Sequence, residues 1–210
     1  NITSDYIVFL NNDVEVTSNW LTPMFNLMDN NKDIGTCQPK ILSFNERKKF
    51  EYAGASGGYL DYLGYPFCRG RIFDFIENDE NQYDDKIEIF WSSGACFMMR
   101  NELFKKNNGF DESFFAHMEE IDLCWRIQSE GYKNYCVPKS KVYHLGGGTL
   151  GYNSPTKTYL NFRNNLVMIL KNESLAFLII KLPLRIIFDI VASFSFLIIK
   201  KSLFHFEIGR

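Results

Sequence analysis

The sequence holds three separated groups of polar side chains whose types are suited to catalysis. The first is Asn11, Asn12 and Asp13, which come directly after the apolar run Tyr6–Leu10. A divalent cation that bridges phosphates prefers oxygen ligands, and one carboxylate with amide neighbours leaves coordination positions open for a substrate. The same residue types are also common in turns. Taken alone, this group is therefore more typical of a turn than of a site.

The second group lies at the start of a helix that the sequence predicts over residues 119–130. Three acidic residues occupy its first turn, namely Glu119, Glu120 and Asp122. Glu120 heads a row of apolar positions at i+3, i+4 and i+7, so we expect its side chain on the inward face. The positive end of the helix dipole is expected to keep Glu120 ionised, as a general base requires.

Asp122 lies four residues before Arg126, a spacing at which side chains of opposite charge pair on a helix. This spacing predicts an orienting role for Asp122 rather than a proton-transfer role. Alternatively, all three acids only stabilise the helix N-terminus, which is a common use of acidic residues. The residues alone do not decide between the two interpretations.

The third group consists of His144 and the three glycines Gly146, Gly147 and Gly148. A single histidine that ends an apolar strand is more often a hydrogen-bonded core residue than a ligand. Glycines, however, let the backbone approach a diphosphate closely, and an imidazole together with a carboxylate makes a reasonable Mn²⁺ or Mg²⁺ site. His144 is therefore a candidate metal ligand.

These groups need elements that bring them together. The run Tyr6–Leu10 predicts a strand buried on both faces of a parallel sheet. The carboxyl end of such a strand is where α/β folds build their sites. A helix over about Asn19–Asn30 and a strand over Ile34–Gln38 would complete a β-α-β unit. The inward side chains expected for this helix are Leu21, Phe25 and Met28.

The middle of the chain has no clear period. Residues 44–85 alternate glycines with aromatic residues and predict a loop or hairpin excursion, in which the acidic stretch 78–85 forms a surface loop. Further on, the pattern predicts strands over 87–91, 95–100, 133–137 and 142–145, a short helix over 102–106, and a helix that begins at Ser154 and Pro155.

The composition changes after residue 173. The stretch Leu175–Ile199 is rich in Leu, Ile and Phe, and charged residues interrupt it too often for a membrane-spanning helix. Its polar residues recur every four positions, which predicts one polar face on a helix lying in a membrane interface, with Pro183 breaking the helix near its start. The alternative is a helix packed on another part of the protein. The polar row is Lys181, Arg185, Asp189 and Ser193.

The bulk composition excludes some classes of protein. A chain of 210 residues with 46% hydrophobic residues can bury an ordinary globular core. A net charge of -2 offers no basic field for nucleic acid. The five scattered cysteines contain no C-x-x-C pair, which favours buried thiols in a reducing compartment. The chain starts without Met and runs at once into a strand, which is typical of a piece of a longer protein.

Five linked motifs occur in one order along the chain. From Asp5 to about Asn172 the sequence resembles family 2 glycosyltransferases of the GT-A fold, including bacterial rhamnosyltransferase-like members. Asn11 stands where the family motif has a first Asp, and Glu120 stands where it has an Asp base. The matching stretches are Tyr6–Asp13, Ser93–Arg100, Gly109–Phe115 with Glu119–Arg126, Tyr143–Thr149, and Asn161–Asn164.

The resemblance implies an α/β fold, a partial GT-A (Rossmann-like) domain with a mixed sheet. We expect residues 1–172 to form the C-terminal half of the catalytic domain and residues 173–210 to form an amphipathic tail at the membrane surface. The part of the fold that would hold the nucleotide base precedes the first motif in the family, and we expect it to be missing here.

The resemblance also implies the roles of the motif residues. Asp13 would bind a divalent cation, Mn²⁺ or Mg²⁺, on the diphosphate of a nucleotide-sugar, with His144 as a second ligand. Glu120 would be the base, a task that Glu119 could share, and Asp122 completes this catalytic motif. Asn11 and Asn12, together with Asp13, would contact the donor. The acceptor would lie against Trp91, Ser93 and Gly94.

The function implied is inverting transfer of a sugar to a hydroxyl of a saccharide or lipid-linked saccharide. We expect it in cell-surface polysaccharide synthesis, in the cytoplasm at the inner face of the cell membrane. The alternative is a catalytically silent carbohydrate-binding module, with the tyrosines and Trp91 as stacking platforms. A metal-dependent phosphohydrolase ranks last, because it needs denser carboxylate clusters.

Overall fold

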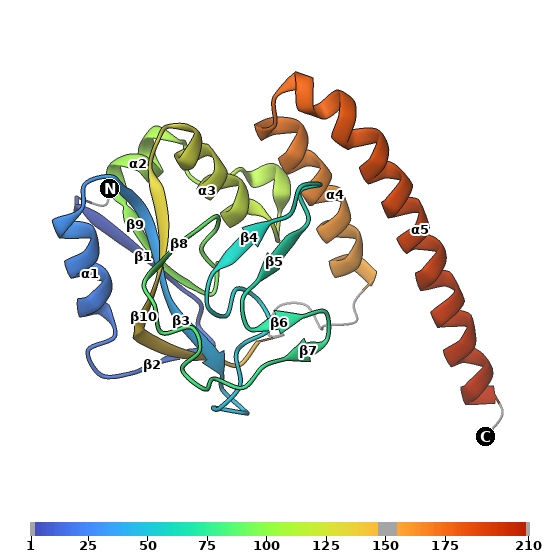
Figure 1. The fold of residues 1–210 in the computed structure, drawn as a ribbon, viewed down its shortest axis with the longest axis horizontal. Helices are drawn as coiled ribbons and strands as arrows, with labels where there is room; N and C mark the ends of the chain where they lie inside the picture. Colours follow the sequence, from blue (N-terminus) through green and yellow to red (C-terminus); the bar gives the residue numbers. More distant parts are fainter. Residues whose placement is uncertain (1–2, 147–154, 209–210) are drawn as a thin grey trace.

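The computed structural model describes residues 3–146 and 155–208, and the side chains of the last helix as far as residue 195. The predicted features at Gly147, Gly148 and Ser154 lie outside the described residues. The described chain forms a mixed α/β fold around one sheet, with two small hairpins and two C-terminal helices beside it (Figure 1).

The main sheet has six strands in the order β1-β9-β3-β10-β2, and β8 pairs with β10 outside this path. Strands β3 and β10 are parallel, whereas the other pairs are antiparallel, so the sheet is mixed as predicted. β10 is one strand and not the two predicted, because a register shift between Val137 and Lys141 absorbs the irregular middle. The bounds are β1 Tyr6–Leu10, β2 Val14–Val16, β3 Ile34–Ser43, β8 Ile87–Ile89, β9 Cys96–Arg100 and β10 Lys133–His144.

The first strand corrects one prediction. Within the described residues β1 lies at an edge of the sheet and pairs only with β9, antiparallel, and it is half-buried. β1 is apolar along its whole length because both of its faces pack against other side chains, and not because it lies inside a parallel sheet. Tyr6 and Val8 pack with one helix-covered cluster, while Phe9 packs with the cluster on the other side. Both faces of β1 therefore need apolar side chains, although one of its edges is open.

Helix α1 (Leu21–Asn30) covers the first face of the sheet through Met24, Leu27 and Met28. The prediction was right for Met28 and wrong for Leu21 and Phe25, which are exposed. The helix begins later than predicted and Trp20 precedes it without a side-chain cap. Each residue turns a helix by about 100°, so residues three and four apart share a face. The face that contacts the sheet is therefore the one that carries Met24, Leu27 and Met28.

Helices α2 (Asn101–Lys106), α3 (Glu119–Ser129) and α4 (Pro155–Asn172) lie on the other side of the sheet (Figure 1). A short 3-10 turn, Glu112–Phe114, precedes α3. Apolar side chains of α3 at Leu123 and Ile127 pack against Phe97 and Met99 of β9. The sheet and the loop before α3 thereby fix where α3 begins.

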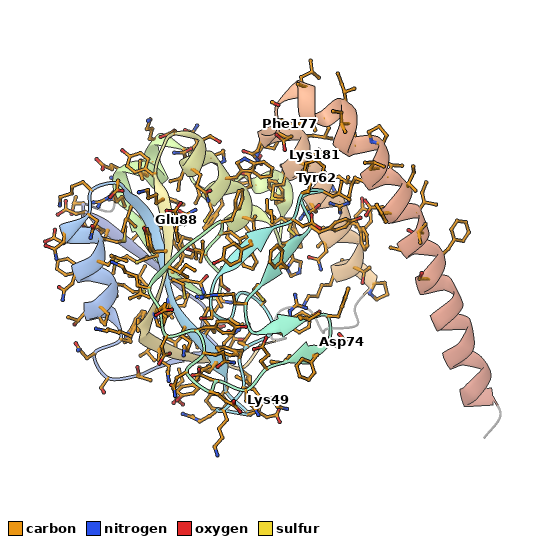
Figure 2. All side chains as sticks on the ribbon, viewed as in Figure 1. Lys49, Tyr62, Asp74, Glu88, Phe177 and Lys181 are labelled. Carbon is orange, nitrogen blue, oxygen red and sulfur yellow. The ribbon has the colours of Figure 1, made fainter. Side chains whose placement is uncertain are left out.

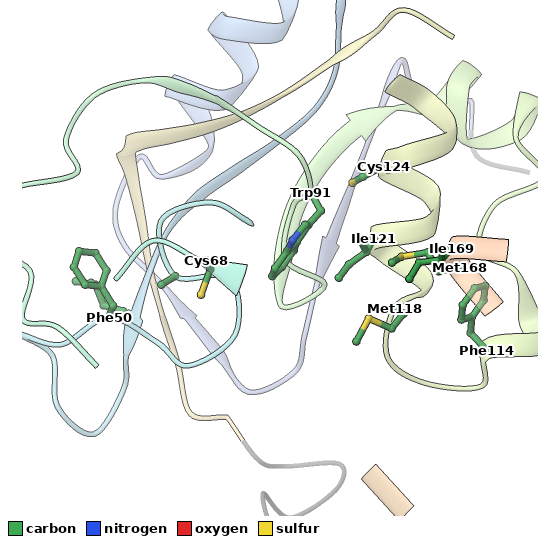
Figure 3. Close-up of a cluster of buried hydrophobic side chains, with 11 residues drawn as sticks. Phe50, Cys68, Trp91, Phe114, Met118, Ile121, Cys124, Met168 and Ile169 are labelled. Carbon is green, nitrogen blue, oxygen red and sulfur yellow. The ribbon is translucent and has the colours of Figure 1, made fainter. Parts of the chain in front are cut away.

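Residues 44–85 form the predicted hairpin excursion. It contains two hairpins, β4 (Gly58–Leu60) with β5 (Pro66–Cys68), and β6 (Arg71–Ile72) with β7 (Phe75–Ile76). A buried cluster joins this excursion to α3 and α4, with Trp91 between Cys68 and Ile121 (Figure 3). The excursion is thus part of the core and forms one wall of the molecule.

The stretch 78–85 lies mostly at the surface, as predicted, but it contributes one buried side chain. The Asp79 side chain is 5% exposed and accepts a hydrogen bond from Nζ of Lys40 at 2.7 Å. Lys40 is fully buried in β3 and also pairs with Asp84. A buried ammonium group needs a carboxylate partner, and the acidic loop supplies it.

Helix α5 (Leu175–Ile208) runs through Pro183 without the predicted break and leans away from the body at its far end (Figure 1). A proline removes one backbone hydrogen bond, but contacts just beyond it hold the helix in place. Arg185 donates to Asp189 at 3.0 Å and to Asn165 of α4, and it lies over the Tyr65 ring at 3.5 Å. Lys181 lies over the rings of Tyr62 and Phe177 (Figure 2).

Lys181, Arg185 and Asp189 of the polar row therefore face the protein body, whereas Ser193 is exposed. The apolar side chains of the helix are left exposed, the reverse of an ordinary surface helix. Among the described residues, no helix is both long and apolar enough to cross a membrane. The exposed apolar residues of α5 include Leu175, Phe177, Ile179, Ile187, Phe188 and Phe194.

Candidate active site

A cavity of about 590 Å³ lies where the three polar groups of the sequence meet, a size typical of small-ligand sites. The end of β1, the turn before β9, the start of α3 and the end of β10 all contribute to its wall. Asn12 and Asp122 are not among its lining residues, whereas the other predicted site residues are. The predicted residues that line it are Asn11, Asp13, Trp91, Ser93, Gly94, Glu119, Glu120 and His144.

His144 lies between two carboxylates. Its Nε2 is 3.2 Å from Oδ1 of Asp13, and its Nδ1 is 3.3 Å from Oε1 of Glu51. Burial disfavours the imidazolium form, but the two carboxylates outweigh it, and the pKa of His144 is raised. The backbone also ties the pair together, since Leu145 N–H donates to the carbonyl of Asp13 at 3.1 Å.

The Asp13 and His144 pair fits a divalent cation as a partial set of ligands. Two adjacent ligand atoms at about 2.1 Å from one ion lie about 3 Å apart, close to the separation of Oδ1 and Nε2. The carboxylate of Glu51 lies beside the other ring nitrogen, Nδ1, which has no hydrogen-bond partner in the described structure. A carboxylate near the second nitrogen is the usual arrangement behind a metal-bound histidine. Within the described part of the chain, no three His, Cys, Asp or Glu side chains form a complete metal site. The remaining ligands would have to come from a substrate.

Glu119 and Glu120 stand at the start of α3 with their carboxylates in the cavity. In the described structure, Oε2 of each has no hydrogen-bond partner. Burial raises the pKa of Glu120, and the charge of Glu119 raises it further, while backbone groups at Gly94 and Ile121 act in the opposite sense. The pKa of Glu120 is therefore raised despite the helix dipole, because desolvation outweighs the dipole.

The loop before α3 is held by Asn164 of α4, the last residue of the fifth motif. Its Nδ2 donates to the carbonyl groups of Phe114, Ala116 and His117 at 2.7–2.8 Å. His117 and the next residue, Met118, have positive φ angles of 69° and 74°, a conformation that side chains disfavour. Asn164 thus fixes a strained loop that sets the position of Glu119 and Glu120.

Asp122 points away from the cavity and is fully buried. It accepts hydrogen bonds from Nε of Arg126 at 2.9 Å and from Nδ2 of Asn172 at 2.7 Å, and Nζ of Lys171 lies 3.1 Å from it. The predicted pair with Arg126 is confirmed. Asp122 therefore joins α3 to α4 and has the orienting position that its spacing predicted.

The turn before β9 forms the wall beside Glu120. The Ser93 hydroxyl donates to the carbonyl of Ala53 at 2.8 Å, and Gly94 lies directly against the carboxyl group of Glu120. Trp91 is 6% exposed, its ring packs on Gly58, and its Nε1 donates to the carbonyl of Tyr59. Because the faces of this ring are covered, Trp91 is poorly placed as a sugar-stacking platform.

Four charged residues of the cavity were missed by the sequence analysis. Glu51 and Arg71 come from the aperiodic excursion, where no period or motif marks them. Lys157 lies early in α4, and Arg185 was assigned to the polar face of a helix in a membrane interface. Of the four residues, only Arg185 stands in a recognisable pattern, the polar row of the last helix. That pattern does not show which surface the row contacts.

The comparisons with known proteins bear on this cavity and on its fold. Residues 1–107, half of the chain, match the family model described as "Glycosyl transferase family 2". The chain belongs to glycosyl transferase family 2. This confirms the resemblance that the motifs indicated, and the match includes Asp13, the turn before β9 and β9 itself.

Individual relatives agree with the family. The chain is 34% identical over 147 residues to rhamnosyltransferase WbbL of Escherichia coli (strain K12), covering 67% of this chain and 52% of the relative. It is 32% identical over 88 residues to N-acetylglucosaminyl-diphospho-decaprenol L-rhamnosyltransferase of Mycobacterium tuberculosis (strain ATCC 25618 / H37Rv), covering 42% of this chain and 28% of the relative. The chain thus spans about half of these relatives or less.

A solved structure supports the fold. The crystal structure of GalNAc-T7 with UDP, GalNAc and Mn²⁺ matches with a TM-score of 0.52 and 16% identity, over 79% of this chain and 31% of that chain. At this identity the likeness concerns the fold alone. It agrees with the predicted GT-A fold of mixed α/β type.

Proposed function

We propose that this family 2 protein transfers a sugar from a nucleotide-sugar donor to a hydroxyl acceptor with inversion at the anomeric carbon. One observation carries the proposal: Glu120 places a carboxylate oxygen without a hydrogen-bond partner in the same cavity as Asp13 and His144. A buried polar atom left unpartnered costs free energy. Its retention in a cavity favours a role toward a ligand.

The reaction is a single displacement. The acceptor hydroxyl attacks the anomeric carbon, Glu120 takes the hydroxyl proton, and the bond from that carbon to the diphosphate breaks. Burial, and after it the charge of Glu119, raise the pKa of Glu120, which makes the ionised base a stronger proton acceptor. Asn11 contacts the donor, and the turn from Trp91 to Gly94 borders the acceptor.

Asp13 and His144 would hold a divalent cation, Mn²⁺ or Mg²⁺, in the cavity. A bound Mn²⁺ or Mg²⁺ supplies electrostatic stabilisation of the departing nucleoside diphosphate. Glu51 fixes the orientation of the His144 ring, since it lies 3.3 Å from Nδ1 and leaves Nε2 toward Asp13. The chemistry of a carboxylate and an imidazole beside an open cavity suits this task.

The acceptor is a saccharide, and we favour a lipid-linked one in cell-surface polysaccharide synthesis at the inner face of the membrane. The name of the mycobacterial relative includes a diphospho-decaprenol acceptor. The exposed apolar side of α5 suits the membrane interface, because the charged row of this helix is already used by Tyr65, Asn165 and Glu173 of the body.

Replacing Glu120 by glutamine tests the base. With a panel of nucleotide-sugars, Glu120→Gln is expected to slow transfer by about 10²–10⁴-fold while the circular dichroism spectrum stays unchanged. The matched variant Glu119→Gln, which alters the neighbouring carboxylate, is expected to lose much less. Transfer at the wild-type rate in Glu120→Gln would remove Glu120 as the base.

Flotation with liposomes that contain anionic lipid tests the membrane surface. Ile187→Ser combined with Phe194→Ser is expected to reduce the floated fraction, because both side chains are exposed on α5. Phe25→Ser is the control, since Phe25 is equally apolar and exposed but lies on α1. Equal flotation of the α5 variant and the wild type would contradict the assignment.

A further inference from the structure

The β6–β7 hairpin presents an apolar tip that packing does not explain. Ile72 is 66% exposed, Phe73 86% and Phe75 69%, and the tip stands clear of the core near the labelled Asp74 (Figure 2). Phe73 also has a φ angle of 51°, which is unfavourable for a side chain of its size. Exposed phenylalanines held in a strained turn indicate a surface that meets another molecule.

Arg71 begins this hairpin and lines the cavity. Its guanidinium group lies over the Tyr52 ring at 3.9 Å, and Nη1 donates to the carbonyl of Phe73 at 3.1 Å. Its Nε is buried without a hydrogen-bond partner, and among the described residues no carboxylate lies within 4.0 Å of it. A guanidinium group that is oriented but lacks an anion is suited to a phosphate, which it binds through two parallel hydrogen bonds.

The cation and the apolar tip are continuous along the chain, since Arg71 is followed by Ile72 and Phe73. A second exposed phenylalanine, Phe115, also lines the cavity, is 84% exposed and has a φ angle of 62°. The cavity therefore combines catalytic carboxylates, an anion-binding side chain and apolar surface that leads outward. These are the three kinds of contact that an amphiphile with a sugar, a phosphate and a hydrocarbon chain requires.

We propose that Arg71 and the β6–β7 hairpin bind the phosphate and the adjoining hydrocarbon chain of a lipid phosphate or diphosphate. The inference rests on the proposed function and names the acceptor class and its site. Phosphate also occurs in the nucleotide donor, but a nucleotide has no hydrocarbon chain that could contact the three exposed apolar side chains of the tip. The lipid source is therefore favoured, and the experiment separates the two.

Titration of the full chain with farnesyl diphosphate, below its micellar concentration, tests the site. Farnesol supplies the hydrocarbon without phosphate, and UDP with Mn²⁺ supplies the diphosphate without lipid. Arg71→Ala is expected to weaken farnesyl diphosphate about tenfold or more, and Arg71→Lys less. Phe73→Ser with Phe75→Ser is expected to weaken it about tenfold. Both variants should bind UDP as the wild type does.

Three outcomes would overturn the proposal. They are unchanged affinity for farnesyl diphosphate in both variants, equal binding of farnesol and farnesyl diphosphate to the wild type, and an equal loss of UDP and farnesyl diphosphate in Arg71→Ala. The control variant Phe25→Ser alters an exposed phenylalanine on α1 and should bind as the wild type does. The titration measures binding, whereas the Glu120→Gln test measures transfer. A negative result in the titration would therefore contradict the lipid-phosphate site without contradicting the proposed reaction.

Discussion

Glu120 and Asp122 lie two residues apart in the first turn of α3, yet their surroundings are opposite. Asp122 is fully buried and its carboxylate is surrounded by Arg126, Lys171 and Asn172. Glu120 faces the cavity with one oxygen unpartnered in the described structure, and burial and Glu119 raise its pKa.

The difference separates two uses of acidic residues at a helix start. A carboxylate whose partners are complete stabilises the fold and has nothing left for a substrate. A carboxylate with an unpartnered oxygen gains little stability and remains available for chemistry. Changes on the Asp122 side should therefore reduce stability, and changes on the Glu120 side should reduce activity.

Removal of Asp122 should give the largest loss of stability. Asp122→Ala leaves the part-buried Arg126 without its carboxylate and Lys171 with Asp111 alone, which is expected to lower the free energy of unfolding by about 2–4 kcal/mol. Glu120→Ala should change it by less than about 1 kcal/mol. Urea denaturation of the two variants measures both values. Similar losses in the two would break the distinction between them.

The second-largest change in stability is expected from cation binding at Asp13 and His144. At about one hundred times its dissociation constant, Mn²⁺ with UDP is expected to raise the free energy of unfolding by about 2.7 kcal/mol. Asp13→Ala should abolish this gain, and Glu51→Gln should weaken Mn²⁺ affinity about 10–100-fold. Thermal unfolding with and without EDTA measures the effect, and Asp122→Asn is the control. The same gain in Asp13→Ala would exclude Asp13 as a ligand.

Removal of Asn164, which holds the loop before α3, should have an intermediate effect on both stability and activity. Asn164→Ala removes the donor to three carbonyl groups of the preceding loop, and the free energy of unfolding should fall by about 1–3 kcal/mol. Transfer should also slow, because the loop positions Glu120. Asn30→Ala, which loses one exposed hydrogen bond, is the control. A stability loss with unchanged transfer would make Asn164 purely structural.

The pH dependence should show the smallest effect. A raised pKa means that folded Glu120 holds its proton more tightly than the unfolded chain does. The protonated Glu120 contributes fully to stability below the ordinary glutamate pKa of about 4.3. This contribution is lost as pH rises from there through the raised pKa of Glu120 in the folded protein. Glu120→Gln should lack this loss, and wild-type transfer should increase over the same rise. Parallel stability profiles of wild type and Glu120→Gln would show that the pKa is not raised.

Much of the site followed from local pattern. The pairing of Asp122 with Arg126 needs only helical spacing, and the inward row of α3 at Leu123, Cys124 and Ile127 was predicted by periodicity and is buried. The ends of β1 and β10 gave Asp13 and His144 as candidates, and the fold brings them within 3.2 Å. Motif order then indicated the family.

The sequence by itself therefore determined most of the elements and the buried face of α3, since these depend on neighbours a few residues away. The tertiary structure decided what each face meets. It placed Glu51 beside His144 across 93 positions of sequence, turned Arg185 inward to the body, and put β1 at an edge. It also raised the pKa of Glu120, because desolvation depends on how deeply the folded chain buries a group.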